Sequence, residues 1–483
     1  MVSTTTTVPR HARTAIGAVL LLLLARYVLL AAACAPFGDD WGYAAMGMRS
    51  EPWARLLHEH RTWNGRYFSN ALVLYGPLTL GLGPGLTLYR LMPVLLLFLS
   101  TAAGAWVLGA RPAFDLPRGD RWMLALGFTL LQLHLMPHLG EGLYWYTGAV
   151  TYQGAWVLML LHAGALLRAE AAGLGWRWGP VAGLTLVAAA GCNETAMVLL
   201  VLGHAVPVLG ALRQGRRPAP MPVALLALAV GCGLVVALAP GNAVRSMHFP
   251  QRHDLWLTLG MGGAQALRFA ASWLVDPVLP AVLLLAWQAG RSEVHRRFPC
   301  VFVRGPVRWS AAAALALAAG TLLPYWAMGM LGQHRTLNLV LAPFLLAAVA
   351  TAMAWGRSLH LRRVPAWSTA RGVRRLALGV ALAGLVGWGN DLHVTRDLLS
   401  GDAWRFRRHT ASLHSGIARA VRNGEALAEV PVFPAPLRSL RIPEPTADPE
   451  AYWNRTLAGY FGGDAFRVVA APAPTASRPP GER

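Results

Sequence analysis

Lysine is absent from this sequence of 483 residues, and charged residues make up only 13% of it. A soluble domain carries about 25% charged residues, so this composition argues against a soluble protein. The four cysteines are scattered and form no CxxC pair, which indicates neither a disulfide framework nor a zinc site. No Walker loop, HExxH or GxSxG motif occurs in a context that would support its usual chemistry.

Long apolar runs take the place of charge in this chain. Hydrophobic residues make up 55% of it, and apolar runs of roughly 18 to 22 residues recur along its length. This pattern predicts an all-α polytopic membrane protein. The formal net charge is +21, and the arginines lie mostly between the apolar runs. This placement is typical of cytoplasmic loops, so we expect the lipid bilayer, and no nucleic acid, as a partner.

The apolar runs and the arginines together predict about eleven transmembrane helices. Arg10 and Arg13 precede the first run, which predicts a cytoplasmic N-terminus and an extracytoplasmic C-terminus in the inner (plasma) membrane of a bacterium. Arg26 lies within that run and is expected to face the bundle interior and pair with a carboxylate. The expected spans are 15–35, 86–109, 122–139, one that ends at Arg168, two short helices within 178–212, 221–239, one after Asp276, 310–329, one before Arg357, and 373–389.

Three regions follow from this topology. Residues 1–390 form the expected membrane domain, in which 36–85 is a long first external loop with helices that lie at the membrane surface. Residues 391–470 form a small extracytoplasmic region. The Pro-rich end, 471–483, is expected to be disordered.

The acidic pair Asp39-Asp40 directly follows the first apolar run. A charge beside lipid is costly, and it usually marks a substrate, ion or proton path. One member of a carboxylate pair has a raised pKa, which suits a general base, while the other can position it or bind a divalent cation. We therefore expect both residues to be catalytic. The alternative is a surface turn that is merely acidic.

Aromatic, amide and charged side chains gather in other segments that the topology places on the same outer side. Arginine suits a phosphate, and aromatic faces with amides suit a sugar. The alternatives are an aromatic belt at the membrane surface and arginines that contact lipid headgroups. The expected substrate-binding residues are Trp41, Trp63, Asn64, Arg66, Glu141, Tyr144, Trp145, Tyr152, Asn193, Glu194, Asn242, Arg245, His334 and Arg335.

Taken together, these motifs resemble the GT-C superfamily of membrane glycosyltransferases. The resemblance is closest to an uncharacterised bacterial multi-pass family near the O-antigen glucosyltransferase-like enzymes. It is carried by Asp39-Asp40-Trp41, Trp63-Asn64-Gly65-Arg66, Tyr144-Trp145-Tyr146-Thr147-Gly148, Asn193-Glu194, Pro240-Gly241-Asn242 with Arg245, and Tyr452-Trp453-Asn454 with Tyr460-Phe461-Gly462.

The resemblance implies a GT-C-like fold and an inverting enzyme of cell-envelope polysaccharide biosynthesis. Such an enzyme moves a sugar from a polyprenyl-phosphate donor to a glycan or lipid acceptor on the extracytoplasmic face. By analogy, Asp39 or Asp40 would deprotonate the acceptor hydroxyl, with Asp39 favoured, and Arg245 or Arg335 would stabilise the departing phosphate. The sequence departs from better-known relatives in its C-terminal tail, which is short and Pro-rich instead of a folded acceptor-binding domain.

Two other functions fit a chain of this composition. A polysaccharide polymerase or ligase also has an external loop rich in arginine, but its large catalytic loop is expected late in the chain. A transporter of lipid-linked glycans should carry charges near the membrane midplane on broken helices, with repeat symmetry between its halves. The sequence shows no convincing internal repeat, and most of its charges fall at one face.

Overall fold

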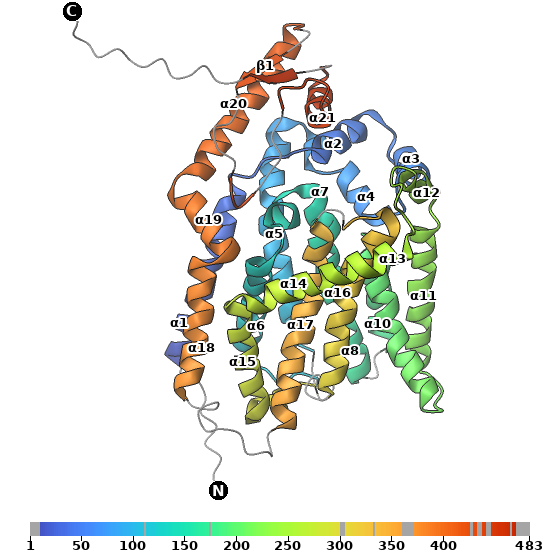
Figure 1. Ribbon diagram of the computed structural model, residues 1–483, viewed down its shortest axis with the longest axis vertical. Coiled ribbons are helices and arrows are strands. Elements are labelled where there is room, and N and C mark those ends of the chain that lie inside the picture. Colours follow the sequence, from blue (N-terminus) through green and yellow to red (C-terminus); the bar gives the residue numbers. More distant parts are fainter. Residues whose placement is uncertain are drawn as a thin grey trace, which may run out of the picture.

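The computed structural model shows a bundle of helices that run along the long axis of the molecule (Figure 1). Each of the eleven apolar segments expected from the sequence contains a helix. The structure describes residues 10–110, 113–172, 175–299, 305–331, 334–359, 371–425, 428–431, 437–440, 446–463 and 466–469. The bundle helices are α1 (Arg10–Ala31), α5 (Leu82–Leu108), α6 (Arg118–Leu135), α8 (Gly154–Ala172), α9 (Gly175–Ala190), α10 (Glu194–Arg213), α11 (Pro220–Ala237), α15 (Val278–Arg291), α16 (Pro306–Met328), α17 (Arg335–Ser358) and α18 (Arg371–Gly387).

Seven helices of the described chain are long and apolar enough to cross a membrane. They are α1, α5, the helical stretch Tyr146–Glu170 that includes most of α8, and α10, α11, α16 and α17. The stretch Leu255–Val275 joins α15 at a bend of 75° and adds an eighth crossing if the bent pair is one span. The described parts of α9 and α18, with 16 and 17 residues, are not among these crossings. A polytopic membrane protein is thus supported, while the count of eleven stays a prediction.

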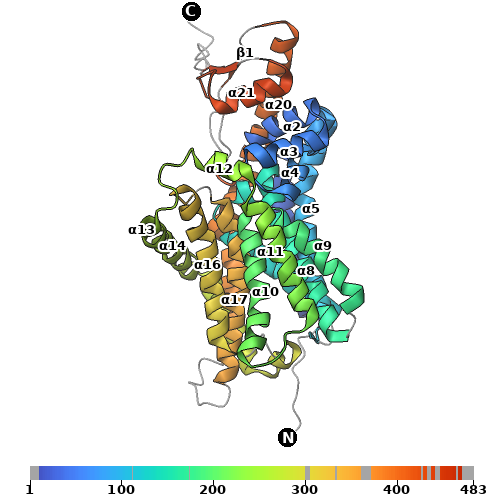
Figure 2. The ribbon, with the colours of Figure 1, turned by 90° about the vertical axis from the view of Figure 1, so that its right-hand side faces the viewer.

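Residues 36–85, the segment expected to be the first external loop, contain short helices, as predicted. They are α2 (Asp39–Arg49), α3 (Pro52–Thr62), α4 (Tyr67–Leu74) and a 3₁₀ turn, Pro77–Leu80. Together with α12 (Pro240–Ser246), the helices α2, α3 and α4 lie at one end of the bundle, which we call the site end (Figures 1 and 2). At the same end, α7 (Tyr146–Gly148) lies between two π-helical turns, Gly140–Tyr144 and Ala149–Gln153.

Two further segments complete the membrane region. The chain after α12 forms α13 (Leu255–Leu257), a π-helical turn Thr258–Gly262 and α14 (Gly263–Val275), which cross the bundle obliquely in Figure 1. A 3₁₀ turn, Glu293–Arg297, follows α15.

The C-terminal region, expected as a short Pro-rich tail, contains three helices and a pair of strands and packs on the site end. It comprises α19 (Gly389–Leu399), α20 (Asp402–Arg422), α21 (Tyr452–Phe461), and the strands β1 (Ala428–Pro431) and β2 (Phe466–Val469), which pair in parallel. Helix α21 lies on α2, where Arg49 donates to the Gly459 carbonyl at 2.6 Å. Tyr460 also donates to the Leu78 carbonyl at 2.9 Å. The end expected to be disordered, 471–483, lies outside the described residues.

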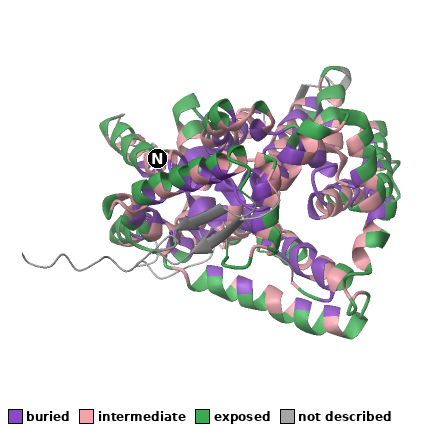
Figure 3. Cartoon of the chain, turned by 90° about the horizontal axis from the view of Figure 1, so that it is seen from above, coloured by how far each residue is buried: buried purple, intermediate pink, exposed green. Residues whose placement is uncertain are grey.

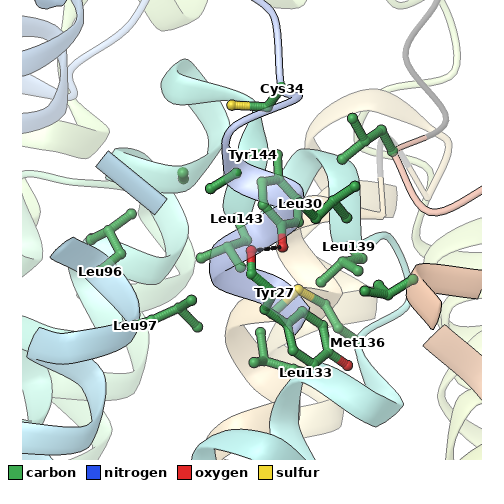
Figure 4. Close-up of a cluster of buried hydrophobic side chains, with 14 of the residues drawn as sticks. Tyr27, Leu30, Cys34, Leu96, Leu97, Leu133, Met136, Leu139, Leu143 and Tyr144 are labelled. Carbon is green, nitrogen blue, oxygen red and sulfur yellow. Dashed lines mark hydrogen bonds between the residues drawn. The ribbon is translucent and has the colours of Figure 1, made fainter. Parts of the chain in front are cut away.

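Buried residues gather in the interior of the bundle, while many outward-facing residues are exposed (Figure 3). Large apolar side chains such as Leu21 and Leu22 are among the exposed ones, as expected for helices that face lipid. The core continues to the site end, where the Tyr144 hydroxyl donates to the Tyr27 carbonyl at 2.8 Å within a cluster of leucines (Figure 4). The bundle thereby holds the loops of the site end in place.

Arg26 pairs with a carboxylate inside the bundle, as the sequence predicts. Its NH2 nitrogen lies 2.7 Å from Asp391 Oδ1, and its NH1 nitrogen donates to Thr395 at 2.7 Å. The other Asp391 oxygen lies 2.7 Å from His134 Nδ1, and His134 Nε2 lies 3.1 Å from Asp276. These contacts join α1 and α6 to α19 and to the bend before α15. The fully buried Asp391 therefore has a polar partner at each oxygen, and one of these partners is the Arg26 guanidinium.

Candidate functional site

The acidic pair begins α2, but its two carboxylates have different surroundings. Gly38 precedes the helix with φ of 55°, in the region that favours glycine, and a Cβ there would lie 2.2 Å from the Trp453 ring. Asp40 is only 4% exposed, whereas Asp39 is half-buried. The close approach of α21 to Gly38 explains why glycine is needed at this turn.

Asp40 ties α2 to the neighbouring elements. Its Oδ1 accepts from the backbone N–H of Thr147 at 3.0 Å and from the Thr147 hydroxyl at 2.7 Å. Its Oδ2 accepts from the Tyr89 hydroxyl at 2.7 Å. These bonds connect the start of α2 to α7 and α5. Asp40 is therefore an anchor of the site.

The bonds around Tyr89 favour a protonated Asp40. The Tyr89 hydroxyl has one proton but two acceptors, since the Tyr144 carbonyl lies 3.0 Å away and Asp40 lies on its other side. A protonated Asp40 can donate to Tyr89, which then donates to Tyr144, so that every group is satisfied. Burial raises the pKa of Asp40 to about 6, and the bonds from Thr147 and Tyr89 only partly oppose this rise.

Asp39 is the open member of the pair. Its Oδ1 accepts a hydrogen bond of 3.0 Å from the Tyr452 hydroxyl on α21. No other group in the described part of the chain donates to this carboxylate. The negative charge of Asp39 contributes to raising the pKa of Tyr43 and of Glu141. Asp39 therefore lies near Glu141, which the sequence also predicted for the site. Asp39 can therefore receive a proton from a bound molecule.

Arg66 and Glu194 form a close ion pair next to α2. Arg66 Nε lies 3.0 Å from both Glu194 oxygens, and its NH2 lies 2.7 Å from Oε2. Burial opposes the charged form of Arg66, but the adjacent carboxylate dominates and raises the pKa of this guanidinium. A carboxylate at the start of a membrane helix needs a partner of opposite charge, and Arg66 is the partner of Glu194.

Two asparagines hold this ion pair in position. Asn64 Oδ1 accepts from the Arg66 backbone N–H at 2.9 Å and from the Asn70 amide at 3.1 Å. Asn193 caps α10, where its Oδ1 accepts from Ala196 N–H at 2.9 Å and its amide donates to the Thr151 carbonyl at 2.7 Å. Both side chains are buried, and these polar atoms already form hydrogen bonds within the protein.

Arg245 adds an uncompensated positive charge to this corner of the site. Its guanidinium lies 5.9 Å from the Trp63 ring centroid, a cation–π contact, and its charge acts on Glu194. Burial lowers the pKa of Arg245, and repulsion from Arg66 lowers it further. The charge of Arg335 lowers the pKa of Arg245 as well. It forms no ion pair with any described carboxylate.

Arg335 supplies a second cation. Its guanidinium lies 4.6 Å from the Trp145 ring centroid, and the Trp145 indole donates to the Phe37 carbonyl at 3.2 Å. Glu141 lies close enough to feel the charges of Arg335, His334 and Asp39. Burial raises the pKa of Glu141, and its Oε2 has no hydrogen-bond partner within the described chain. This carboxylate therefore faces the cations without being bonded to one.

Three residues predicted to bind substrate are instead packed against, or hydrogen-bonded to, other parts of the protein. Trp41 is buried, and its ring contacts His414 and Tyr460 of the C-terminal region, at centroid distances of 4.9 and 4.8 Å. Tyr144 is equally buried, with its hydroxyl bonded to Tyr27. The Asn242 amide donates to the Val236 carbonyl at 2.7 Å, at the end of α11. Such side chains position the site but do not face into it.

The remaining predicted residues differ in accessibility. Tyr152 is buried. Trp63 is exposed beside Arg245. His334 is also exposed, with its ring 5.9 Å from that of Phe269. The structure thus places these residues at the same end of the bundle, as expected, around Arg66, Arg245 and Arg335.

The sequence alone indicated no roles for Tyr89, Thr147 or Tyr452. Tyr89 lies inside an apolar run, where a single tyrosine gives no signal of its own. Thr147 and Tyr452 belong to the motifs that carry the resemblance, but nothing in their spacing indicates that they bond Asp40 and Asp39. A contact between residues 413 positions apart could be found only from the fold.

The described residues contain no group of three or more His, Cys, Asp and Glu side chains that could hold a metal ion. Both oxygens of Asp40 already have hydrogen-bond partners, so only Asp39 of the pair has a carboxylate open to a ligand. The geometry therefore does not favour the divalent cation considered for Asp39 and Asp40.

The chain matches no protein-family model, and neither a curated protein nor a solved structure is similar to it. The resemblance to GT-C enzymes thus stays a prediction, and function has to be inferred from the geometry of the site.

Proposed function

We propose that the protein is a membrane glycosyltransferase that moves a sugar from a polyprenyl-phosphate donor to a hydroxyl of a glycan or lipid acceptor. The observation that supports this most strongly is a convergence of groups at the site end. The open carboxylate of Asp39 acts on Glu141, and Glu141 also feels Arg335. Arg335 and Arg245 interact in turn, and neither has a carboxylate partner among the described residues.

The two cations suit the phosphate of the donor. Arg66 is neutralised by Glu194, so Arg245 and Arg335 provide most of the remaining positive charge. Arginine binds phosphate oxygens through two parallel hydrogen bonds, and a fixed positive charge stabilises a phosphate as it leaves. The apolar helices of the bundle are suited to lie in a bilayer, and a polyprenyl chain would dissolve in the same bilayer.

The proposed reaction is a single inverting displacement. The acceptor oxygen attacks the anomeric carbon of the sugar and forms the new C–O bond, while the bond from that carbon to the phosphate oxygen breaks. The acceptor proton passes to Asp39. The electron pair of the broken bond leaves with the polyprenyl phosphate, whose charge Arg245 and Arg335 compensate. The acceptor hydroxyl would approach Asp39 on the side of its carboxylate that Tyr452 does not bond.

A transporter of lipid-linked glycans is a second candidate because of one observation. Asp276, His134 and Asp391 form a line of hydrogen bonds, and Asp276 and Asp391 lie at breaks between helices. Charges at helix breaks inside a bundle are typical of transporters. Against this, Arg26 and Tyr27 also bond Asp391, which leaves it no open position for a substrate.

The test is an assay of the purified protein with a panel of radiolabelled polyprenyl-phosphate sugars and a lipid extract as acceptor. Glycosyl transfer or donor hydrolysis by the wild-type protein, lost in Asp39→Asn, would support the proposal. Movement of the intact donor across proteoliposomes, with no cleavage, would favour the transporter instead. Turnover that is equal in wild type and Asp39→Asn would refute the assigned base.

A further inference from the structure

A second polar network lies inside the bundle, at the bend between α14 and α15 (Figure 1). The helical stretch Leu255–Val275 meets α15 there at 75°. Pro277 follows Asp276 directly, and a residue before a proline disfavours the helical conformation. The Asp276 carboxylate stabilises this bend, because its Oδ1 accepts from the backbone N–H of Val278 at 2.9 Å. The same oxygen lies 3.1 Å from His134 Nε2 on α6.

The His134 imidazole lies between two carboxylates. Its Nδ1 is 2.7 Å from Asp391 Oδ2, and its Nε2 is 3.1 Å from Asp276 Oδ1. A neutral imidazole carries one N–H, so it can donate to only one of two ionised carboxylates, and its other nitrogen is a lone pair. Both contacts become hydrogen bonds when one more proton is present, either on His134 or on Asp276. In either case this proton lies between Nε2 and the Asp276 carboxylate.

The surrounding groups decide which carboxylate needs the additional proton. Arg26 and Tyr27 donate to Asp391 Oδ1, at 2.7 and 2.9 Å. Asp391 is therefore stabilised as an anion, and it would receive the single N–H of a neutral His134. The Asp276 carboxylate would then face the lone pair of Nε2, and the network would hold one cation against two anions. A net charge buried inside the bundle is costly, so the additional proton is favoured.

The other side of the bend, α14, contacts the first half of α17. The ring centroids of Trp273 and Phe344 are 5.0 Å apart, and those of Phe269 and His334 are 5.9 Å apart. Arg335 follows His334 directly. A movement of α14 would therefore reach the end of α17 that carries one cation of the candidate site.

We infer that a proton is bound between His134 Nε2 and Asp276 Oδ1, and that its release frees the bend between α14 and α15 from α6. While the proton is bound, the hydrogen bond holds the bend on α6. Once the proton has passed to the solvent, the lone pair of His134 and the negative charge of Asp276 repel each other. The network is thus sensitive to pH, and alkaline pH loosens α14. The inference does not depend on the proposed transferase reaction.

The test is pulsed EPR spectroscopy of the purified full-length protein in lipid nanodiscs. One spin label is placed on α14 with Leu267→Cys and the other on α9 with Leu184→Cys, both exposed positions. Cys34, Cys192 and Cys232 are buried, and Cys300→Ser removes the remaining thiol. We expect one distance between the labels at about pH 6, and a second distance whose population grows as the pH is raised to about 10.

Asp276→Asn should remove this response and show one distance at every pH, because an amide can donate to a neutral imidazole and accept from a charged one. Asp254→Asn is the matched control. Asp254 is an exposed carboxylate just before the same bent stretch, where it caps α13 by accepting from the Leu257 N–H at 2.9 Å. This variant should respond to pH like the wild type.

A single distance in the wild type over the whole pH range would overturn the inference, as would an equal response in Asp276→Asn. If Asp276→Asn does not fold, Asp276→Ser takes its place, because a hydroxyl also donates and accepts and is suited to the start of a helix. None of these readouts uses the transferase reaction.

Discussion

Consecutive residues of a helix point about 100° apart, and this separates the roles of Asp39 and Asp40. Asp40 turns into the bundle, where Thr147 and Tyr89 bond both of its oxygens. Asp39 turns towards α21 and bonds only Tyr452 among the described residues. Paired carboxylates could be recognised in the sequence, but which of them is open depends on groups more than 100 residues away. The preference for Asp39, which the resemblance alone suggested, now has a structural reason.

The surroundings of Asp40 predict an unusual response of stability to pH. Its pKa of about 6 lies above the ordinary carboxyl value, so the folded state binds more protons than the unfolded state between about pH 4 and pH 6. The stability that Asp40 contributes is therefore complete below about pH 4 and is lost as the pH rises through about 6. In Asp40→Asn, the amide can donate to Tyr89 as a protonated carboxyl does, and this dependence should disappear.

Thermal unfolding in detergent from about pH 4 to 8 checks this prediction. Asp40→Asn should be at least as stable as the wild type at the alkaline end of this range. Asp40→Ala should lose about 2–4 kcal/mol at every pH, because the N–H and the hydroxyl of Thr147 then lose their acceptor. The protonated state would be contradicted if the unfolding temperature of the wild type rose as the pH is raised through the pKa of Asp40 and this rise were absent from Asp40→Asn.

At the scale of elements, the sequence predicted several features correctly. The break at Cys192-Asn193-Glu194 divides α9 from α10, because Asn193 caps a new helix. Short helices fill the first external loop, since Pro52 begins α3 and glycines such as Gly38 allow tight turns. The docking of α21 on α2 was not foreseen. Its hydrogen bonds and aromatic contacts join segments that are far apart in the chain, which no local pattern reports.

Helix α21 should affect the reaction through Tyr452. Tyr452→Phe removes the only described hydrogen bond to Asp39. We expect the transfer rate to fall by about tenfold, since a loosely held base loses orientation, while the melting temperature stays unchanged. Tyr460→Phe is the matched control, because it removes a hydroxyl from the same helix, one that bonds Leu78 and not Asp39. Equal rates in the two variants would rule out a role for Tyr452 in positioning.

At the scale of the whole molecule, buried charges join the two ends of the chain. Arg26 on α1 and Asp391 on α19 are 365 positions apart, and His134 lies between Asp391 and Asp276. The sequence predicted a partner for Arg26 because an unpaired charge inside the membrane is costly. It could not identify Asp391, since several carboxylates were available. The count of spans stays a prediction, because in the described chain α9 and α18 have only 16 and 17 residues.

Asp391→Asn should destabilise the protein strongly. It leaves Arg26 and His134 buried without their carboxylate, and a broken buried pair costs about 3–5 kcal/mol. Thermal unfolding in detergent measures the loss. Glu293→Gln provides the control, because Glu293 pairs with Arg296 at the surface, where such pairs contribute less than about 1 kcal/mol. If both variants unfolded at the same temperature, the buried network would not join α1 to α19.

The proposed reaction requires that Asp39 accept the proton of the acceptor while Arg245 and Arg335 bind the departing phosphate. The decisive measurement is the initial rate of sugar transfer from the best donor of the panel, compared between wild type, Asp39→Asn and Glu51→Gln. Glu51 is an exposed carboxylate of the same external loop. We predict a loss of at least about 100-fold for Asp39→Asn and no loss for Glu51→Gln. Equal rates in Asp39→Asn and wild type would contradict the role of Asp39.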